Sequence, residues 1–564
     1  MSVIPSGHHR RLIPWRIDLR GRGDDGYLAV AFALAAIVAM PFAALVWLAA
    51  SGTSSNWAHL ATTILPEAAR VTLQLMLGVA VLTGTFGVVT AWLVATFDFP
   101  GRRLFSWALV LPLAVPTYIA AYCFVEFLHF AGPVQSAIRA VFGFQSSRDY
   151  WFPDVRSLWG AILILSSVLY PYVYLTVRMV FLMQGRKAAD VARTLGASQA
   201  SVFLKVLFPL ARPAIAIGVS LALMESINDI GAVEFLGVRT LTFAVYSTWL
   251  NRGDLYGATQ IALLMLAVIV LLVMVERFAR RKQRFTLGRA DRPQPGSQQL
   301  SRGKAVLACA ACALPILLGF AIPLLVLGDY ALRRLDQLAD QQLWRALFHT
   351  VTLAGTTGLV TVLAGFMLAY GVRLTGSKRL KFMTRLAVLG YAVPGTVLAI
   401  GILIPLAGLD NWVDARMRAG FDVSTGLLLT GSGFAIVYAG FVRFMAMGHG
   451  SLESAFTKLS PHLDMAARTL GRSPGATLFE VILPLMRPAL LTAFLLVFVE
   501  ASKELSATIL LRPFDFETLA TFVYSQTSRS AFEDGSVAAL LIVLVGILPV
   551  AILNRSILAE TARG

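Results

Sequence analysis

The sequence contains the segment RTLGASQASVFLKVLFPLARPAI, from Arg193 to Ile215, and repeats it without a gap as RTLGRSPGATLFEVILPLMRPAL, from Arg468 to Leu490. The two copies are 275 residues apart. The same register continues to Glu225 and Glu500, after which three additional residues enter the second copy. An internal repeat of this kind defines the organisation of the whole chain, which we expect to consist of two related halves.

The likeness between the halves extends beyond this segment. After the insertion, TLTFAVYS (240–247) aligns with TLATFVYS (518–525). Earlier matches join 71–73 to 351–353 and Val115-Pro116 to Val393-Pro394. The repeat therefore covers nearly the whole of each half.

The composition places the chain in a lipid bilayer. Hydrophobic residues make up 57% of the 564 positions and charged residues 14%, whereas about one quarter of the residues in soluble domains are charged. Long apolar runs predict about twelve membrane spans. They are expected at 28–50, 70–97, 104–128, 158–183, 212–236, 258–276, 304–328, 348–373, 383–407, 426–447, 487–511 and 535–555. The predicted fold is an all-α membrane protein with two parallel six-helix repeats, because an even number of spans gives both halves the same orientation.

This pattern divides the chain into four parts. We expect a cytoplasmic N-terminal segment (1–27), a first half (28–276), a basic cytoplasmic linker (277–303) and a second half (304–564). The linker is rich in Pro, Gly, Ser and Gln, which is typical of loops. The first apolar run is too long for a signal-peptide core and is expected to remain as an uncleaved anchor.

The net charge of +17 reflects membrane orientation rather than nucleic-acid binding, because the basic residues flank alternate ends of the expected spans. This distribution predicts that both termini lie in the cytoplasm. The residues concerned are Arg10, Arg11, Arg16, Arg20, Arg22, Arg102, Arg103, the cluster at 277–304, Lys378, Arg379, Lys381, Arg385, Arg555 and Arg563. The three cysteines, Cys123, Cys309 and Cys312, are interpreted as small apolar residues inside spans, since no second cysteine pair or nearby histidine completes a metal site.

The repeated segment lies between the fourth and fifth expected spans of each half, on the predicted cytoplasmic side. A short Ala-rich run, 187–198 or 464–473, predicts a helix that ends at a glycine. Two prolines follow in each copy, Pro209 and Pro213 or Pro484 and Pro488, and we expect them to break the chain before the next span. The predicted shape is helix, turn, helix.

These residues resemble the EAA loop of importer-type ABC permeases, with Gly196 and Gly471 at its central glycine and the four prolines at its later positions. The acidic residue at the start of the EAA pattern is matched less closely. The first copy offers Ala188, Ala189, Asp190 and Ala192, and the second offers Asp464, Ala466 and Ala467. The resemblance implies a type I importer permease in which each loop docks on a partner ATPase and transmits its movement. Two copies in equivalent loops favour this interpretation over an ordinary amphipathic helix.

No phosphate-binding loop of the G-x-x-x-x-G-K-[ST] type occurs in the sequence. We therefore expect this chain not to be an enzyme and to bind no cofactor, with ATP and Mg on two copies of a cytoplasmic ATPase subunit. An external substrate-binding protein and the lipid bilayer are the other expected partners. The expected location is a bacterial inner membrane.

Three stretches look similar to the fused two-half permeases of ferric-iron importers, a group that includes thiamine, phosphonate and polyamine relatives. They are 147–161, 168–178 and 221–246. The resemblance favours iron as the cargo and leaves those relatives' cargoes as alternatives.

Ionisable residues inside spans are candidates for a transport pathway. The fifth and eleventh expected spans contain Glu225, Asn228, Asp229, Glu234, Glu500, Lys503 and Glu504. Glu225 and Glu500 are matched between the halves, so they are predicted to face a central path and are candidates for transient contact with Fe(III). The alternative is that these acids lie at helix ends or pair internally, as Glu500 and Lys503 would.

Two further features have conventional explanations. Tyr246 and Tyr524 are matched aromatic residues and are expected to be membrane anchors. Pro112, Pro116 and Pro394 are expected to produce kinks that serve packing. A secondary transporter or channel is the competing class, but it would leave the paired loops unexplained.

Overall fold

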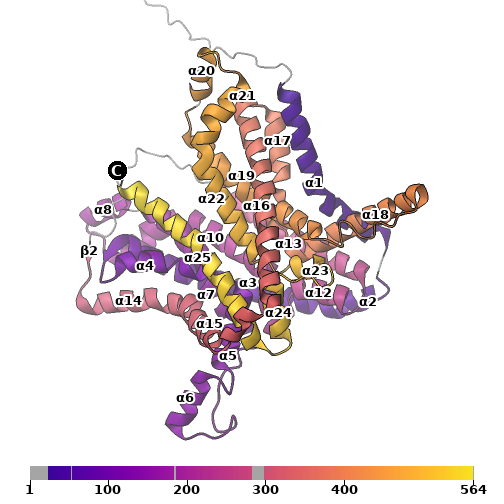
Figure 1. Cartoon of the computed structure of the whole chain (residues 1–564). Helices are drawn as coiled ribbons and strands as arrows, with labels where there is room; N and C mark the ends of the chain where they lie inside the picture. Colours follow the sequence, from indigo (N-terminus) through magenta and orange to yellow (C-terminus); the bar gives the residue numbers. More distant parts are fainter. Residues whose placement is uncertain (1–22, 53, 183–185, 282–297, 461, 563–564) are drawn as a thin grey trace, which may run out of the picture.

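A computed structural model of the chain describes residues 23–52, 54–182, 186–281, 298–460 and 462–562, and this part is almost entirely helical (Figure 1). Two-residue strands β1 (Phe97–Asp98) and β2 (Gln298–Gln299) pair in parallel. Most of the predicted N-terminal segment and linker lies outside the described residues. The all-α prediction is confirmed.

The elements of the first half are α1 (Gly23–Ser51), α2 (Trp57–His59), η1 (Leu60–Ile64), α3 (Leu65–Thr96), α4 (Arg102–Ala108), η2 (Leu111–Ala114), α5 (Thr117–Leu128), α6 (Pro133–Phe142), α7 (Leu158–Val180), α8 (Arg186–Thr194), α9 (Gln199–Val202), η4 (Phe203–Leu207), α10 (Phe208–Asn228), α11 (Ile230–Phe235), α12 (Leu241–Leu250) and α13 (Leu255–Arg281). Here η denotes a 3-10 or π turn.

The elements of the second half are α14 (Arg302–Ile316), η5 (Leu317–Ala321), α15 (Ile322–Arg333), η6 (Leu335–Ala339), α16 (Gln341–Thr375), α17 (Lys378–Ala387), η7 (Leu389–Ala392), α18 (Gly395–Phe421), α19 (Phe434–Lys458), α20 (His462–Thr469), α21 (Pro474–Thr477), η8 (Leu478–Ile482), α22 (Leu483–Ser502), α23 (Thr508–Leu511), α24 (Leu519–Ser528) and α25 (Phe532–Ala562).

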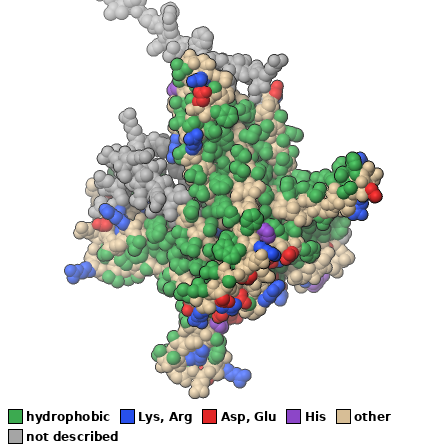
Figure 2. All heavy atoms as spheres, viewed as in Figure 1, with side chains coloured by type: hydrophobic (Ala, Val, Ile, Leu, Met, Phe, Trp, Pro, Cys, Tyr) green, Lys and Arg blue, Asp and Glu red, His purple; other side chains and the backbone are tan. Residues whose placement is uncertain are grey.

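Nine helical segments of the described chain are long and apolar enough to cross a membrane, and a bent pair makes a tenth. The two other expected spans correspond to α19 and α25. Arg443 and His449 reduce the apolar character of α19, and the side chains of α25 are described only to Leu548. Hydrophobic side chains cover most of the face shown in Figure 2, over α16, α22 and α25, as expected of a lipid-facing surface.

Four of the expected spans are broken, which the sequence did not predict. Span 104–128 turns by 96° at Pro116, between η2 and α5, and span 383–407 breaks at Pro394, between η7 and α18. Spans 212–236 and 487–511 break after α10 and α22. Kinks were expected at Pro116 and Pro394, and the structure has a full break at each, because both residues adopt extended backbone and start new helices.

The prolines of the repeated loops behave in the opposite way. The predicted break at Pro209 and Pro484 was wrong, since 199–228 and 475–502 are each one continuous helical segment. A π turn, η4 or η8, ends two positions before each of these prolines. The wider turn accommodates a residue that has no N–H and whose ring would contact the carbonyl four positions earlier. The same device occurs before Pro66 and Pro323, where η1 and η5 precede the proline.

The halves share close helix pairs at matched positions. α3 packs on α7 in the first half and α16 on α19 in the second. A Cβ added to Gly87 would lie 2.5 Å from the Cβ of Val173. A Cβ added to Gly365 would lie 3.0 Å from the backbone nitrogen of His449. Matched hydrogen bonds also occur, from the Leu241 N–H to Thr72 Oγ1 (2.9 Å) and from the Leu519 N–H to Thr350 Oγ1 (2.8 Å).

The first span of each half, α1 in the first and α14 to α15 in the second, packs against the other half. α1 contacts α17 and α18, and the Tyr438 hydroxyl donates to the carbonyl of Ile37 on α1 (2.5 Å). α15 contacts α5, where the Tyr330 hydroxyl donates to Glu126 (3.0 Å). These reciprocal contacts hold the two halves together at their interface.

Close packing at Gly365 generates a stability prediction. Replacing Gly365 with Leu should lower the free energy of unfolding by about 1–3 kcal/mol, because the side chain would displace the backbone of α19. Thermal denaturation of the purified protein in detergent measures the effect. Gly355→Leu is the matched control on the same helix, since nothing lies within 4 Å of its added Cβ. Equal destabilisation by both substitutions would contradict the close-approach argument.

Candidate functional site

A cavity of about 90 Å³ lies at the interface of the two halves, where the broken helices meet. All six residues predicted for the pathway line it. They are Glu225, Asn228 and Asp229 from the first half, and Glu500, Lys503 and Glu504 from the second. The segment that follows Pro116 and the middle of α7 complete the lining. The structure therefore brings together residues from two sequence regions about half a chain apart, although their role in transport remains a prediction.

Two of the acids cap the helices that begin at the breaks. The Asp229 carboxylate accepts the N–H of Ala232 (2.9 Å) at the start of α11. The Glu504 carboxylate accepts the N–H groups of Ala507 (2.9 Å) and Thr508 (3.1 Å) and the Thr508 hydroxyl (2.9 Å) at the start of α23. Capping supplies partners for N–H groups that a new helix leaves unpaired.

The three-residue insertion falls in this region. The break after α10 contains only Asp229, whereas the break after α22 contains Lys503 to Ala507. The longer segment places Glu504 and Ser506 in the interface. The insertion thus makes the two halves chemically different at their point of contact.

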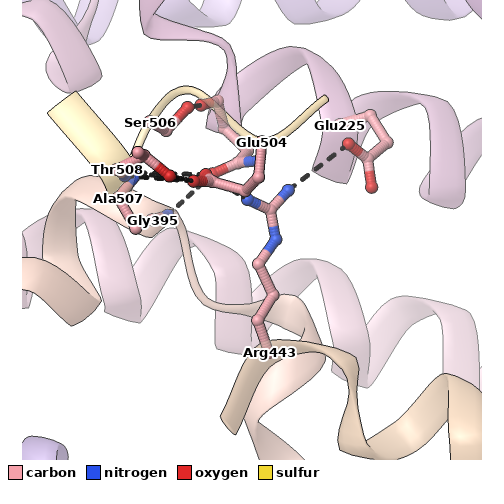
Figure 3. Close-up of polar contacts among 8 residues, drawn as sticks. Glu225, Gly395, Arg443, Glu504, Ser506, Ala507 and Thr508 are labelled. Atoms are coloured by element: carbon pink, nitrogen blue, oxygen red, sulfur yellow. Dashed lines mark hydrogen bonds and ion pairs between the residues drawn. The ribbon is translucent and has the colours of Figure 1, made fainter. Parts of the chain in front are cut away.

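Hydrogen bonds join the halves beside the cavity (Figure 3). The Gly395 N–H donates to Asn228 Oδ1 (2.7 Å), and the Ser506 hydroxyl donates to the Asn228 carbonyl (2.8 Å). Both contacts therefore join a residue of the first half to residues of the second half. Asn228 is 8% exposed.

Tyr246 and Tyr524 form a second matched contact. Their hydroxyls lie 3.2 Å apart, and the Tyr524 hydroxyl donates to Glu234 (2.8 Å). Tyr246 is 8% exposed. Tyr524 is half-buried. The expectation that these residues are membrane anchors was wrong, because their hydroxyls pair with each other between the halves.

Arg443 is the site residue that the sequence analysis missed. It projects from α19 between acids of both halves (Figure 3), 2.9 Å from Glu504 and 3.7 Å from Glu225. Its side chain is 10% exposed. The available signal was a single arginine within the apolar run of the expected span 426–447, since such a residue usually has a partner or faces a cavity.

Glu500 pairs with Lys503 on its own helix segment, at 2.8 Å, as the internal-pairing alternative predicted. Glu225 and Glu500 line the same cavity, but within the described residues no group of three or more His, Cys, Asp or Glu side chains is placed to hold a metal ion. All three cysteines are free thiols, and Cys123 and Cys312 are buried. A transient role for the two glutamates toward a metal remains a prediction.

The repeated loops form the predicted short helices, α8 and α20. Gly196 (φ 83°) and Gly471 (φ 78°) end them in the left-handed conformation that favours glycine. The Ala197 N–H donates to the Ala192 carbonyl and the Arg472 N–H to the Ala467 carbonyl, both at 3.0 Å, in the bond pattern that closes a Schellman turn.

The other loop residues show a buried side and an exposed side. Ala189 and Ala467 are buried, Ala188 and Ala192 are half-buried, and Ala466 is exposed. Asp190 pairs with Arg193 (3.0 Å), and Asp464 pairs with Arg373 of α16 (2.8 Å). Beside the glycines, Leu195 and Leu470 are 82% and 80% exposed at matched positions. Each loop therefore presents an apolar residue beside its turn.

The chain matches the family described as binding-protein-dependent transport system inner membrane component, over residues 83–284 and 361–561. These two matches cover more than half of the chain and fall one in each half. The chain belongs to this family and is the membrane permease component of a binding-protein-dependent importer.

Particular relatives narrow the comparison. The chain is 25% identical over 488 residues to the Fe(3+)-transport system permease protein FbpB 2 of Haemophilus influenzae, covering 86% of this chain and 88% of that protein. It is 23% identical to the ferric transport system permease protein FbpB of Actinobacillus pleuropneumoniae, over 77% of this chain and 61% of that protein. The sulfate transport system permease protein CysT of Escherichia coli is 29% identical over 43% of this chain and 89% of its own length. The fused two-half organisation is thus shared with the ferric permeases.

The Asn228 contact generates a second stability prediction. Asn228→Ala should lower the free energy of unfolding by about 1–3 kcal/mol, because the buried N–H of Gly395 loses its acceptor. Ser226→Ala is the matched control on the same helix, since the buried Ser226 hydroxyl has no hydrogen-bond partner in the described structure. Thermal denaturation in detergent compares the two, and an equal or smaller loss for Asn228→Ala would contradict the assignment.

Proposed function

We propose that this permease moves ferric iron across a bacterial inner membrane by alternating access, powered by two partner ATPase subunits and supplied by an external binding protein. The ferric-transport relatives, which match 86% and 77% of this chain, support this cargo. Both termini are proposed to lie in the cytoplasm.

The observation that carries the proposal is the charge of the central cavity. Four carboxylates line it, from Glu225, Asp229, Glu500 and Glu504, against the two cationic side chains of Arg443 and Lys503. An excess of acid in a confined, partly desolvated space favours cations and opposes anions. Carboxylate oxygen is also a ligand class that suits hard metal ions. The cavity therefore supports a cationic cargo over the sulfate and molybdenum cargoes named for other relatives.

The loops support the coupling step. Leu195 and Leu470 offer exposed apolar contacts on short helices whose glycine turns leave the adjacent space open. Such a surface fits a groove on another protein. ATP and Mg would bind to the partner, and closure of two partner subunits would move α8 and α20 together with the helices that continue from them.

Thiamine and polyamines are also cations, so the cavity charge is compatible with them. Phosphonate is an anion and is not favoured by the same argument. The cavity charge therefore supports a cationic cargo in general, and the relatives support iron in particular.

The loop glycines provide a test of coupling. Substituting Val at Gly196 and Gly471 places β-branched residues at positive φ and should distort both turns. We expect binding-protein-dependent uptake in reconstituted vesicles to fall by about tenfold or more, within the range of known coupling energies, while the partner's ATP hydrolysis continues. Asn at both positions is the control, because Asn tolerates the left-handed conformation. Unchanged uptake by the Val variant would contradict the coupling role.

Cargo identity is tested by uptake of labelled ferric iron, thiamine, phosphonate and sulfate into vesicles that contain the permease, its ATPase and its binding protein. Iron should accumulate only with ATP, and Glu225→Gln should reduce its accumulation because the cavity loses a carboxylate. Accumulation of another cargo in place of iron would overturn the iron assignment.

A further inference from the structure

The central cavity contains one cationic side chain that joins the two halves. Arg443 contacts Glu504, on its own half, and Glu225, on the other half. Lys503, the other cation, pairs with Glu500 within the second half. Arg443 is therefore the side chain through which the acids of the two halves share a positive charge.

The two contacts of Arg443 differ in strength. The Glu504 carboxylate is fixed by the N–H groups of Ala507 and Thr508, and it accepts a hydrogen bond from Arg443 Nη1 at 2.9 Å. The Arg443 Nη2 lies 3.7 Å from Glu225 Oε2, beyond normal hydrogen-bond length. The Glu225 side chain is 25% exposed, compared with 8% for Glu504. Arg443 is thus anchored on the second half and more loosely paired with the first.

This arrangement has no counterpart in the first half. At the 275-residue offset of the repeat, Val168 of α7 occupies the position matched to Arg443, and it also lines the cavity. The arginine is consequently a feature of one half rather than of the repeat.

We propose that Arg443 is a built-in counter-ion for the acids at the centre of the pathway. When cargo is absent it pairs with Glu225 and Glu504, and when a cargo cation enters its contact with Glu225 breaks. This inference rests on the proposed function, since it concerns the same pathway. In the present conformation the guanidinium neutralises acids from both halves and keeps free cations from binding there. Movement of the halves breaks the longer Glu225 contact first and exposes that carboxylate, while Glu504 keeps the guanidinium on the second half.

The proposal makes Arg443 a determinant of specificity. A cargo must compete with a guanidinium for Glu225, so a multivalent cation competes better than a monovalent one. A neutral or anionic solute gains nothing from the exchange. Removing the arginine should therefore create a cation site that the native protein does not offer.

Binding of Tb³⁺, a trivalent oxygen-seeking probe, tests this in the purified full-length chain in detergent. Tyr172 lines the cavity and can sensitise Tb³⁺ luminescence. We expect Arg443→Gln to bind Tb³⁺ about tenfold or more tighter than the native protein, because carboxylates left without their cation are strongly unfavourable. The double variant Glu225→Gln with Arg443→Gln should lose most of this gain. Lys503→Gln is compared in parallel, because it removes the same charge from the same cavity but leaves only Glu500 without its partner, so it should gain less than Arg443→Gln, which leaves acids of both halves unpaired.

Each outcome decides the proposal. Native-like affinity of Arg443→Gln, or an equal gain in Lys503→Gln, would overturn it. If Arg443→Gln does not fold, Arg443→Lys replaces it, since one ammonium group cannot span both carboxylates as the planar guanidinium does and should give a gain of about threefold; no gain would count against the proposal. Because this assay uses neither ATPase nor iron, its failure is distinct from a failure of iron uptake.

Discussion

Backbone hydrogen bonding at four broken helices is the constraint on which this structure depends. A helix that begins within a membrane protein leaves N–H groups that cannot turn to water and must find partners in the protein. Here Asp229 and Glu504 cap α11 and α23, and Asn228 accepts the N–H of Gly395 at the start of α18. The breaks therefore bring polar side chains to one place for structural reasons, and the cavity at the interface is their consequence.

The same capping divides the acids of the cavity into two kinds. Asp229 and Glu504 are committed to backbone N–H groups, whereas Glu225 accepts no such bond among those described and faces Arg443 at a longer distance. Glu500 is paired with Lys503. The capping acids are held by backbone N–H groups, whereas Glu225 is held by side chains alone.

The two repeats share most of their helix packing and differ at the central site. Matched glycines, matched threonine hydrogen bonds and matched loop turns preserve the same helix packing in both halves. The three-residue insertion, and the presence of Arg443 where the first copy has Val168, make the centre itself asymmetric. Fusion in one chain permits this, since the two halves of a fused permease need not be identical.

The sequence by itself determined the membrane class, the two halves, the loop turns at Gly196 and Gly471 and the set of acids, because hydrophobicity, repeat register and glycine conformation are local properties. The tertiary structure decided the rest. Pro116 and Pro394 break their helices, whereas Pro209 and Pro484 lie within helices after a π turn. Which of the two occurs depends on the hydrogen-bond partners available to the freed backbone groups. The pairing of Arg443 with Glu225, across more than two hundred residues, likewise has no local signal beyond the cost of a buried charge.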